Sequence, residues 1–70
     1  MISPLASVDS TAKIGKNVTI QPFAYIEGDV EIGDDCVIMS NASILKGTRL
    51  GKGNKVHHGA VLGSEPQDFH

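Results

Sequence analysis

The sequence is poor in the residues that mark several common classes of protein. Its seventy residues contain no tryptophan, one tyrosine, two phenylalanines and one cysteine, and the formal net charge is −2. A single cysteine excludes an internal disulfide framework and is typical of a protein from a reducing compartment. The weakly acidic charge argues against nucleic acid as a partner. No apolar run is long enough for a membrane span, and no stretch has the pattern of a signal peptide. We therefore predict a cytoplasmic location.

Aliphatic residues recur at every sixth position without a miss. Side chains two residues apart on a strand face the same side, and a second series of small residues lies two positions before the first. A helix is excluded, because a step of six residues turns about 240° and builds no single apolar face. The aliphatic series is Ile2, Val8, Ile14, Ile20, Ile26, Ile32, Ile38, Ile44, Leu50, Val56 and Leu62; the small series is Ala6, Ala12, Val18, Ala24, Val30, Cys36, Ala42, Thr48, Asn54 and Ala60. Each hexapeptide thus predicts a short strand with two inward side chains, followed by a corner.

A longer period lies within the first. Gly15, Gly33 and Gly51 are eighteen residues apart, so three hexapeptides make one turn of a triangular prism. Fixed short periods are typical of solenoids, and a hexapeptide period of a parallel β-helix. We predict an all-β protein with about four coils, in which residues 1–70 form a single domain. Cys36 falls on the inward series and is interpreted as a packing residue.

Residues eighteen apart should stack in columns, roughly 4.8 Å from turn to turn. The outward column Lys13, Glu31 and Arg49 alternates in sign, so neighbours in it should attract. Two other outward columns are more apolar, and we expect one of them to meet another subunit. They are Thr19, Val37 and Lys55, and Tyr25, Ser43 and Val61.

The repeat stops after Leu62. The next aliphatic position is occupied by Asp68 and the small position before it by Pro66. A solenoid that drops its rule often sends out a functional loop, and we predict the start of such a loop over residues 63–70; fraying is the alternative. Solenoid ends need caps and nothing after Leu62 resembles one. We therefore expect these residues to be the N-terminal part of a longer solenoid, marginally stable alone.

Several stretches carry a resemblance to a known family. The hexapeptides of residues 2–62 resemble the left-handed β-helix acyltransferases. The segment Ala60-Val61-Leu62-Gly63-Ser64-Glu65-Pro66-Gln67-Asp68 resembles, more specifically, the UDP-N-acetylglucosamine acyltransferases of lipid A synthesis, in which a coil ends in Gly and Gln-Asp follows. The opening residues 2–12 and Gln21-Pro22-Phe23 are similar to that family too.

The resemblance implies a left-handed coil and a homotrimer with active sites between subunits. The implied reaction is the first step of lipid A synthesis: transfer of a 3-hydroxyacyl chain from acyl carrier protein to the glucosamine 3-hydroxyl of UDP-N-acetylglucosamine, without cofactor or metal. Gln67, Asp68 and His70 would bind substrate, although the family usually has Lys at the last position. The general-base histidine would lie in later coils, so no catalytic residue is expected in residues 1–70, which alone would be inactive.

The remaining histidines favour a structural interpretation. His57 and His58 are adjacent in a predicted corner, and no third ligand lies at a zinc spacing, which argues against a β-helical carbonic anhydrase. Two alternatives stay open. One is another hexapeptide acyl- or acetyltransferase. The other is a non-catalytic β-helix scaffold, although an ice-binding scaffold would need a threonine ladder and the outward columns here are mixed.

Overall fold

The structure, a computed structural model, describes residues 1–63. Within this range the chain forms ten strands of two residues each and no helix, so no described helix is long and apolar enough to cross a membrane. The strands are β1 Ser7–Val8, β2 Lys13–Ile14, β3 Thr19–Ile20, β4 Tyr25–Ile26, β5 Glu31–Ile32, β6 Val37–Ile38, β7 Ser43–Ile44, β8 Arg49–Leu50, β9 Lys55–Val56 and β10 Val61–Leu62. Each strand ends on the aliphatic residue of its hexapeptide, as predicted.

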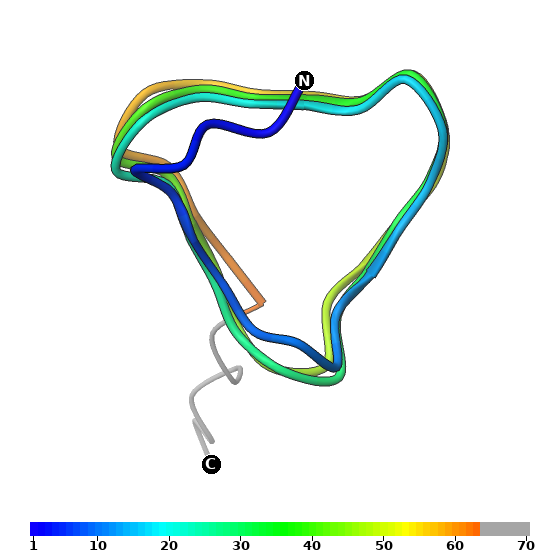
Figure 1. Cartoon of the computed structure of the whole chain (residues 1–70). Helices are drawn as coiled ribbons and strands as arrows, with labels where there is room; N and C mark the ends of the chain where they lie inside the picture. The colour runs from blue at the N-terminus through cyan, green and yellow to red at the C-terminus, as the bar shows by residue number, and fades with distance from the viewer. Residues whose placement is uncertain (64–70) are drawn as a thin grey trace, which may run out of the picture.

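The strands form three parallel sheets, one on each side of a triangular coil (Figure 1). Their orders are β1-β4-β7-β10, β2-β5-β8 and β3-β6-β9. Every pairing joins residues eighteen apart, as in Ile14↔Ile32 and Ile32↔Leu50. An isolated bridge between Ile2 and Ile20 extends the third sheet at its N-terminal edge. The predicted prism with three hexapeptides a turn is confirmed, and the described residues make three turns and the first strand of a fourth.

The core is one column of inward side chains along the prism axis. Both predicted series contribute to it, and Cys36 is fully buried within it, in line with its interpretation as a packing residue. The buried hydrophobic residues are Val18, Ile20, Ala24, Ile26, Val30, Ile32, Cys36, Ile38, Ala42, Ile44 and Val56. Residues of the terminal turns, such as Val8 and Leu62, only partly bury their side chains against this column. Burial is therefore deepest where turns lie both above and below, although Val56 in the last strand of its sheet is buried as well.

From Asn17 onward, one residue in each corner has a left-handed backbone, again at a period of six. These residues are Asn17, Phe23, Asp29, Asp35, Asn41, Gly47, Gly53 and Gly59, with φ between 55° and 88°. Left-handed conformations cost non-glycine residues about 1–2 kcal/mol, least for Asn and Asp. The predicted turns at residues 15–17, 33–35 and 51–53 belong to this series. Phe23, with φ 69°, is the one bulky member.

The eighteen-residue column of Gly15, Gly33 and Gly51, which precedes the left-handed residues in these corners, has a steric origin. Gly33 does not have a positive φ, but a Cβ added there would lie 2.6 Å from the backbone nitrogen of Lys52 in the next turn. At Gly15 a Cβ would lie 2.8 Å from the nitrogen of Asp34. Successive turns approach closely at this corner, so the eighteen-residue glycine period records a contact between backbones.

Candidate functional site

The residues predicted to bind substrate follow the last described strand. Gln67, Asp68 and His70 lie outside the described residues, and their role stays a prediction. The chain that leads to them is well fixed, because β10 pairs in parallel with β7 through Val61↔Ser43 and Leu62↔Ile44. Leu45 N also donates a hydrogen bond to Leu62 O at 2.9 Å. The sheet thus defines the backbone up to the end of the periodic part of the sequence.

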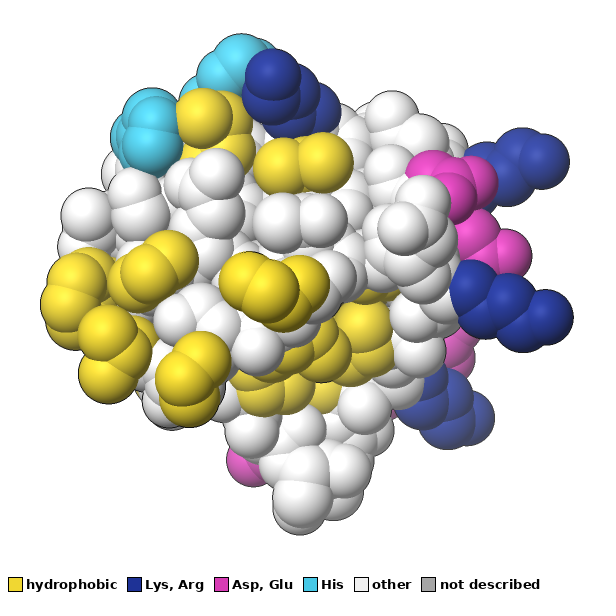
Figure 2. Space-filling view, turned by 45° about the horizontal axis from the view of Figure 1, so that its top comes forward, with side chains coloured by type: hydrophobic (Ala, Val, Ile, Leu, Met, Phe, Trp, Pro, Cys, Tyr) yellow, Lys and Arg dark blue, Asp and Glu magenta, His cyan; other side chains and the backbone are white. Residues whose placement is uncertain are grey.

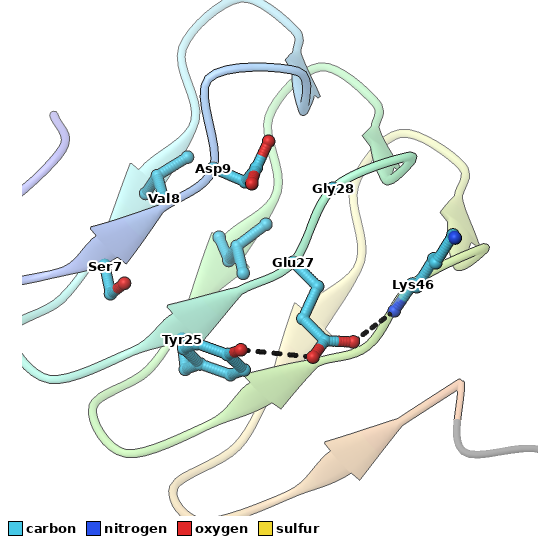
Figure 3. A pocket seen from close by; sticks show the side chains of 8 residues that line it. Ser7, Val8, Asp9, Tyr25, Glu27, Gly28 and Lys46 are labelled. Carbon is cyan, nitrogen blue, oxygen red and sulfur yellow. Dashed lines mark hydrogen bonds between the residues drawn. The ribbon is translucent and has the colours of Figure 1, made fainter.

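A shallow groove of about 300 Å³ lies on the first sheet near the corner after β1 and β4 (Figure 3). Its lining residues are Ser7, Val8, Asp9, Tyr25, Ile26, Glu27, Gly28 and Lys46. The Tyr25 hydroxyl donates to Glu27 Oε2 at 3.1 Å, and the backbone nitrogen of Lys46 donates to Glu27 Oε1 at 2.8 Å. Glu27 therefore joins two turns at this corner, and both of its carboxylate oxygens are engaged.

Hydrogen bonds and nearby charges shift the pKa values of Tyr25 and Asp9 in this groove. The hydrogen bond to Glu27 and the negative charge of that carboxylate raise the pKa of Tyr25, because an ionised phenol would face a second anion. Asp9 Oδ1 accepts from the Thr11 hydroxyl at 2.6 Å and from the Thr11 nitrogen at 2.8 Å, and these bonds lower the pKa of Asp9. With its pKa lowered, Asp9 is not poised near neutrality as a general base. The polar side chains of the groove therefore stabilise the corner through hydrogen bonds.

The predicted polar corner at the two histidines is confirmed for the side chains of His57 and His58, both of which are exposed. His58 Nδ1 lies 2.9 Å from Ser40 Oγ in the turn below, and Ser40 N donates to Gln21 Oε1 at 3.0 Å. A serine beside a histidine has the elements of an activated nucleophile. However, no carboxylate of residues 1–63 forms an ion pair with His58, and these residues contain no group of three metal-ligating side chains. The contact joins turns at the corner.

The alternating charged column is confirmed in part. Arg49 Nε lies 3.6 Å from Glu31 Oε2, as the column predicts, but its shorter contact is from Nη2 to Asp29 Oδ1 at 2.8 Å. This hydrogen bond and the positive charge of Arg49 lower the pKa of Asp29. The sequence interpretation missed the pair because it compared residues eighteen apart, whereas Arg49 reaches back twenty. Testing offsets of eighteen plus two along the outward face would have found it.

The chain is a hexapeptide coil with short strands and closely approaching corners. Comparison with known families identifies the class of protein that has these features. The profile of the bacterial transferase hexapeptide family (six repeats) matches residues 11–42 and 29–64, and the chain belongs to this family.

Particular relatives follow from the same sequence. The acyl-[acyl-carrier-protein]–UDP-N-acetylglucosamine O-acyltransferase of Chlamydia caviae is 43% identical over 68 residues, which is 97% of this chain and 24% of the relative. The protein of the same name from Brucella ovis is 39% identical over 67 residues, 96% of this chain and 24% of the relative. The chain thus spans about a quarter of the length of these relatives. The predicted resemblance to the UDP-N-acetylglucosamine acyltransferases is confirmed.

Solved structures agree. UDP-N-acetylglucosamine acyltransferase from Campylobacter jejuni superposes with a TM-score of 0.93 at 36% identity, covering 99% of this chain and 27% of that one. The Arabidopsis enzyme of that name gives 0.85 at 33% identity, covering 87% and 21%. The predicted left-handed parallel β-helix is confirmed by this similarity.

Proposed function

We propose that the protein to which these residues belong transfers a 3-hydroxyacyl chain from acyl carrier protein to the 3-hydroxyl of the glucosamine in UDP-N-acetylglucosamine, in the cytoplasm. The observation that carries this proposal is similarity over nearly the whole chain to relatives named for acyl transfer to that nucleotide sugar, at 43% and 39% identity. The superposition of the same residues on the Campylobacter jejuni enzyme supports it.

The proposed reaction moves an acyl group from the thioester of acyl carrier protein to an oxygen ester of the sugar. The sugar hydroxyl oxygen attacks the thioester carbonyl carbon, a C–O bond forms and the C–S bond breaks. A general base takes the hydroxyl proton, and the leaving thiolate receives a proton to become the free thiol. We propose that Gln67, Asp68 and His70 bind the nucleotide sugar, and that the general base is a histidine outside these seventy residues.

We also propose a homotrimer. Large hydrophobic side chains are exposed along one corner of the coil: Leu5 is 61% and Phe23 63% exposed, and Phe23 N donates to Leu5 O at 3.2 Å, which places them in adjacent turns. Figure 2 shows hydrophobic side chains gathered below the two histidines, with charged side chains on the opposite side. Of the two columns predicted to meet a subunit, the one with Tyr25 and Val61 is the more exposed, at 44% and 57%. Burial of this apolar surface supports association.

An assay of the complete protein tests the proposed reaction. UDP-N-acetylglucosamine and 3-hydroxyacyl-acyl carrier protein should give the 3-O-acyl nucleotide sugar, detected by mass spectrometry. Asp68→Asn should weaken binding of UDP-N-acetylglucosamine by about 1–3 kcal/mol in calorimetry, because the charged acceptor of a hydrogen bond becomes a neutral amide. The matched control is Asp35→Asn at a corner, which should leave affinity unchanged. Acyl transfer to other acceptors only, with no binding of UDP-N-acetylglucosamine, would replace this proposal by another hexapeptide acyltransferase.

A further inference from the structure

The backbone at Gly63, directly after β10, has a conformation that the earlier turns lack at the same position. Gly63 has φ 83°, and the residues at the same place in the two turns below, Glu27 and Leu45, do not have a positive φ. The corner residues with left-handed backbones in lower turns, such as Asp29 and Gly47, lie two positions later in their hexapeptides. Gly63 therefore does not repeat the backbone conformation of the earlier turns at the position where the hexapeptide rule ends.

Thr48, in the turn below, lies against the backbone at Leu62 and Gly63. It occupies the inward series of small residues, whose earlier members are apolar, and it adds a hydroxyl there. Its Oγ1 donates to Leu45 O at 2.6 Å and lies 3.4 Å from Leu62 O. The Leu45 nitrogen bonds the same Leu62 oxygen at 2.9 Å. The carbonyl just before Gly63 thus accepts a hydrogen bond from Leu45 N, and the Thr48 hydroxyl lies beside it.

Gly63 and Thr48 also fit each other sterically. A Cβ added to Gly63 would overlap Thr48 Oγ1 and would lie 3.1 Å from Leu45 O. Both the positive φ and the lack of space require glycine at this position. The Thr48 hydroxyl and the bare Gly63 backbone therefore form one contact, which we call the exit contact, and it fixes where the chain leaves the last described strand.

We propose that Thr48 and Gly63 are positioning residues for the sugar-nucleotide-binding segment, an inference that rests on the proposed function. Gln67 and Asp68 follow Gly63 by four and five residues. Binding groups must be held by supporting contacts, since a displacement of about 1 Å costs on the order of a hundredfold in rate. The exit contact is the last described support before those residues.

Steady-state kinetics of the complete protein with varied UDP-N-acetylglucosamine tests this role. Thr48→Val removes the hydroxyl and keeps the shape, and Gly63→Ala adds the excluded Cβ. Each should raise KM for the nucleotide sugar roughly tenfold, the value of one lost hydrogen bond or a similar displacement. Thr48→Ser restores the hydroxyl and should stay within about twofold of the parent. Thr19→Val, the same change on the outward face of β3, is the matched control and should not change KM.

The KM readout separates positioning from stability. A variant that is merely less stable loses active molecules, so its apparent kcat falls while KM stays unchanged. If Thr48→Val fails to fold, Gly63→Ala decides, because Gly63 is exposed and outside the core. An active parent whose KM is unmoved by these changes overturns the positioning role alone. A parent that neither binds nor acylates UDP-N-acetylglucosamine overturns the proposed function, and this inference with it.

Discussion

The central turn and the last described turn are built from one repeat but are held together differently. In the central turn Ile38 and Ile44 are completely buried, whereas Leu50 in the next turn is only partly so. The left-handed corners differ as well. In the earlier turns they carry Asn, Asp or Phe, and the last three in the series are glycines. A hexapeptide therefore gains its burial from the turns on both sides, whereas the backbone of each corner depends on the residues of that corner.

Side chains in the earlier corners make bonds that glycine cannot. Asn17 Nδ2 donates to Asp35 Oδ1 at 2.8 Å, and both residues have left-handed backbones. Asp34 Oδ1 accepts from the Lys16 nitrogen at 2.7 Å. Each such bond between turns contributes about 0.5–1.5 kcal/mol and offsets part of the conformational cost of the corner. Gly47, Gly53 and Gly59 avoid that cost and have no side chain of their own with which to form such a bond.

The largest expected effect lies in the core. Ile38→Ala should lower the free energy of unfolding by about 2–5 kcal/mol, because a fully enclosed side chain leaves a cavity. Leu50→Ala should cost less than half as much in the seventy-residue chain, since Leu50 is only partly covered. Urea denaturation followed by circular dichroism gives both values. Equal losses at the two positions would show that the burial difference between turns has no energetic consequence.

A smaller effect is expected at Phe23, the exception among the early corners. Its side chain is 63% exposed, its φ is 69°, and it makes none of the side-chain hydrogen bonds found at Asn17 and Asp35. Phe23→Gly should therefore be more stable than Phe23→Ala by about 1 kcal/mol, because alanine keeps the Cβ that strains a left-handed residue and glycine removes it. Thermal unfolding of the two variants measures the difference.

Asn41→Gly and Asn41→Ala provide the matched pair for this comparison. Asn41 has the same kind of backbone, with φ 64°, but asparagine tolerates it better than an aromatic residue does. The glycine variant should again exceed the alanine variant by a similar amount, since both pairs compare Gly with Ala at a left-handed position. A glycine variant at Phe23 no more stable than its alanine counterpart would mean that this corner relaxes to another conformation when the ring is lost.

The strands and the core could be predicted from the sequence because a period of six combines with the alternation of a strand. Ile20, Ile32 and Cys36 are buried for no reason beyond their place in that period. Contacts between corners could not be predicted in this way. Glu27 reaches Lys46 and Gln21 reaches Ser40 across nineteen residues, and these offsets depend on the path of each corner.

Two other features could not be predicted from the sequence pattern, and the physical reasons can be named. The left-handed backbone of Phe23 has no sequence signal, because turn chemistry is read from Gly, Asn and Asp. The candidate site begins where periodicity ends, so Gln67 and Asp68 were singled out by family resemblance alone. The exit contact between Thr48 and Gly63 had a weak signal in the sequence. Thr48 is the first hydroxyl in an inward series whose earlier members are apolar, and a glycine follows the last regular strand.

The smallest expected effect is electrostatic and concerns the earlier turns, where Arg49 reaches back to Asp29. Arg49 lowers the pKa of Asp29, so the pair stabilises the fold above the unfolded carboxyl pKa of about 3.9, and that stability is lost as pH falls through the lower folded value. Arg49→Gln should raise the pKa of Asp29 toward the ordinary value, as followed by NMR of its carboxyl carbon. Because both side chains are exposed to solvent, salt should weaken the effect.

Asp9 is the internal control for that titration. Its pKa is lowered by the Thr11 hydroxyl and nitrogen, and Arg49 is not among the causes, so Arg49→Gln should leave it unchanged. Thr11→Val should do the reverse, raising the pKa of Asp9 and sparing Asp29, because it removes the hydroxyl and keeps the backbone bond only. A shift of both carboxyls in Arg49→Gln would mean that the corners are coupled through the coil, and the corners would then not be independent of one another.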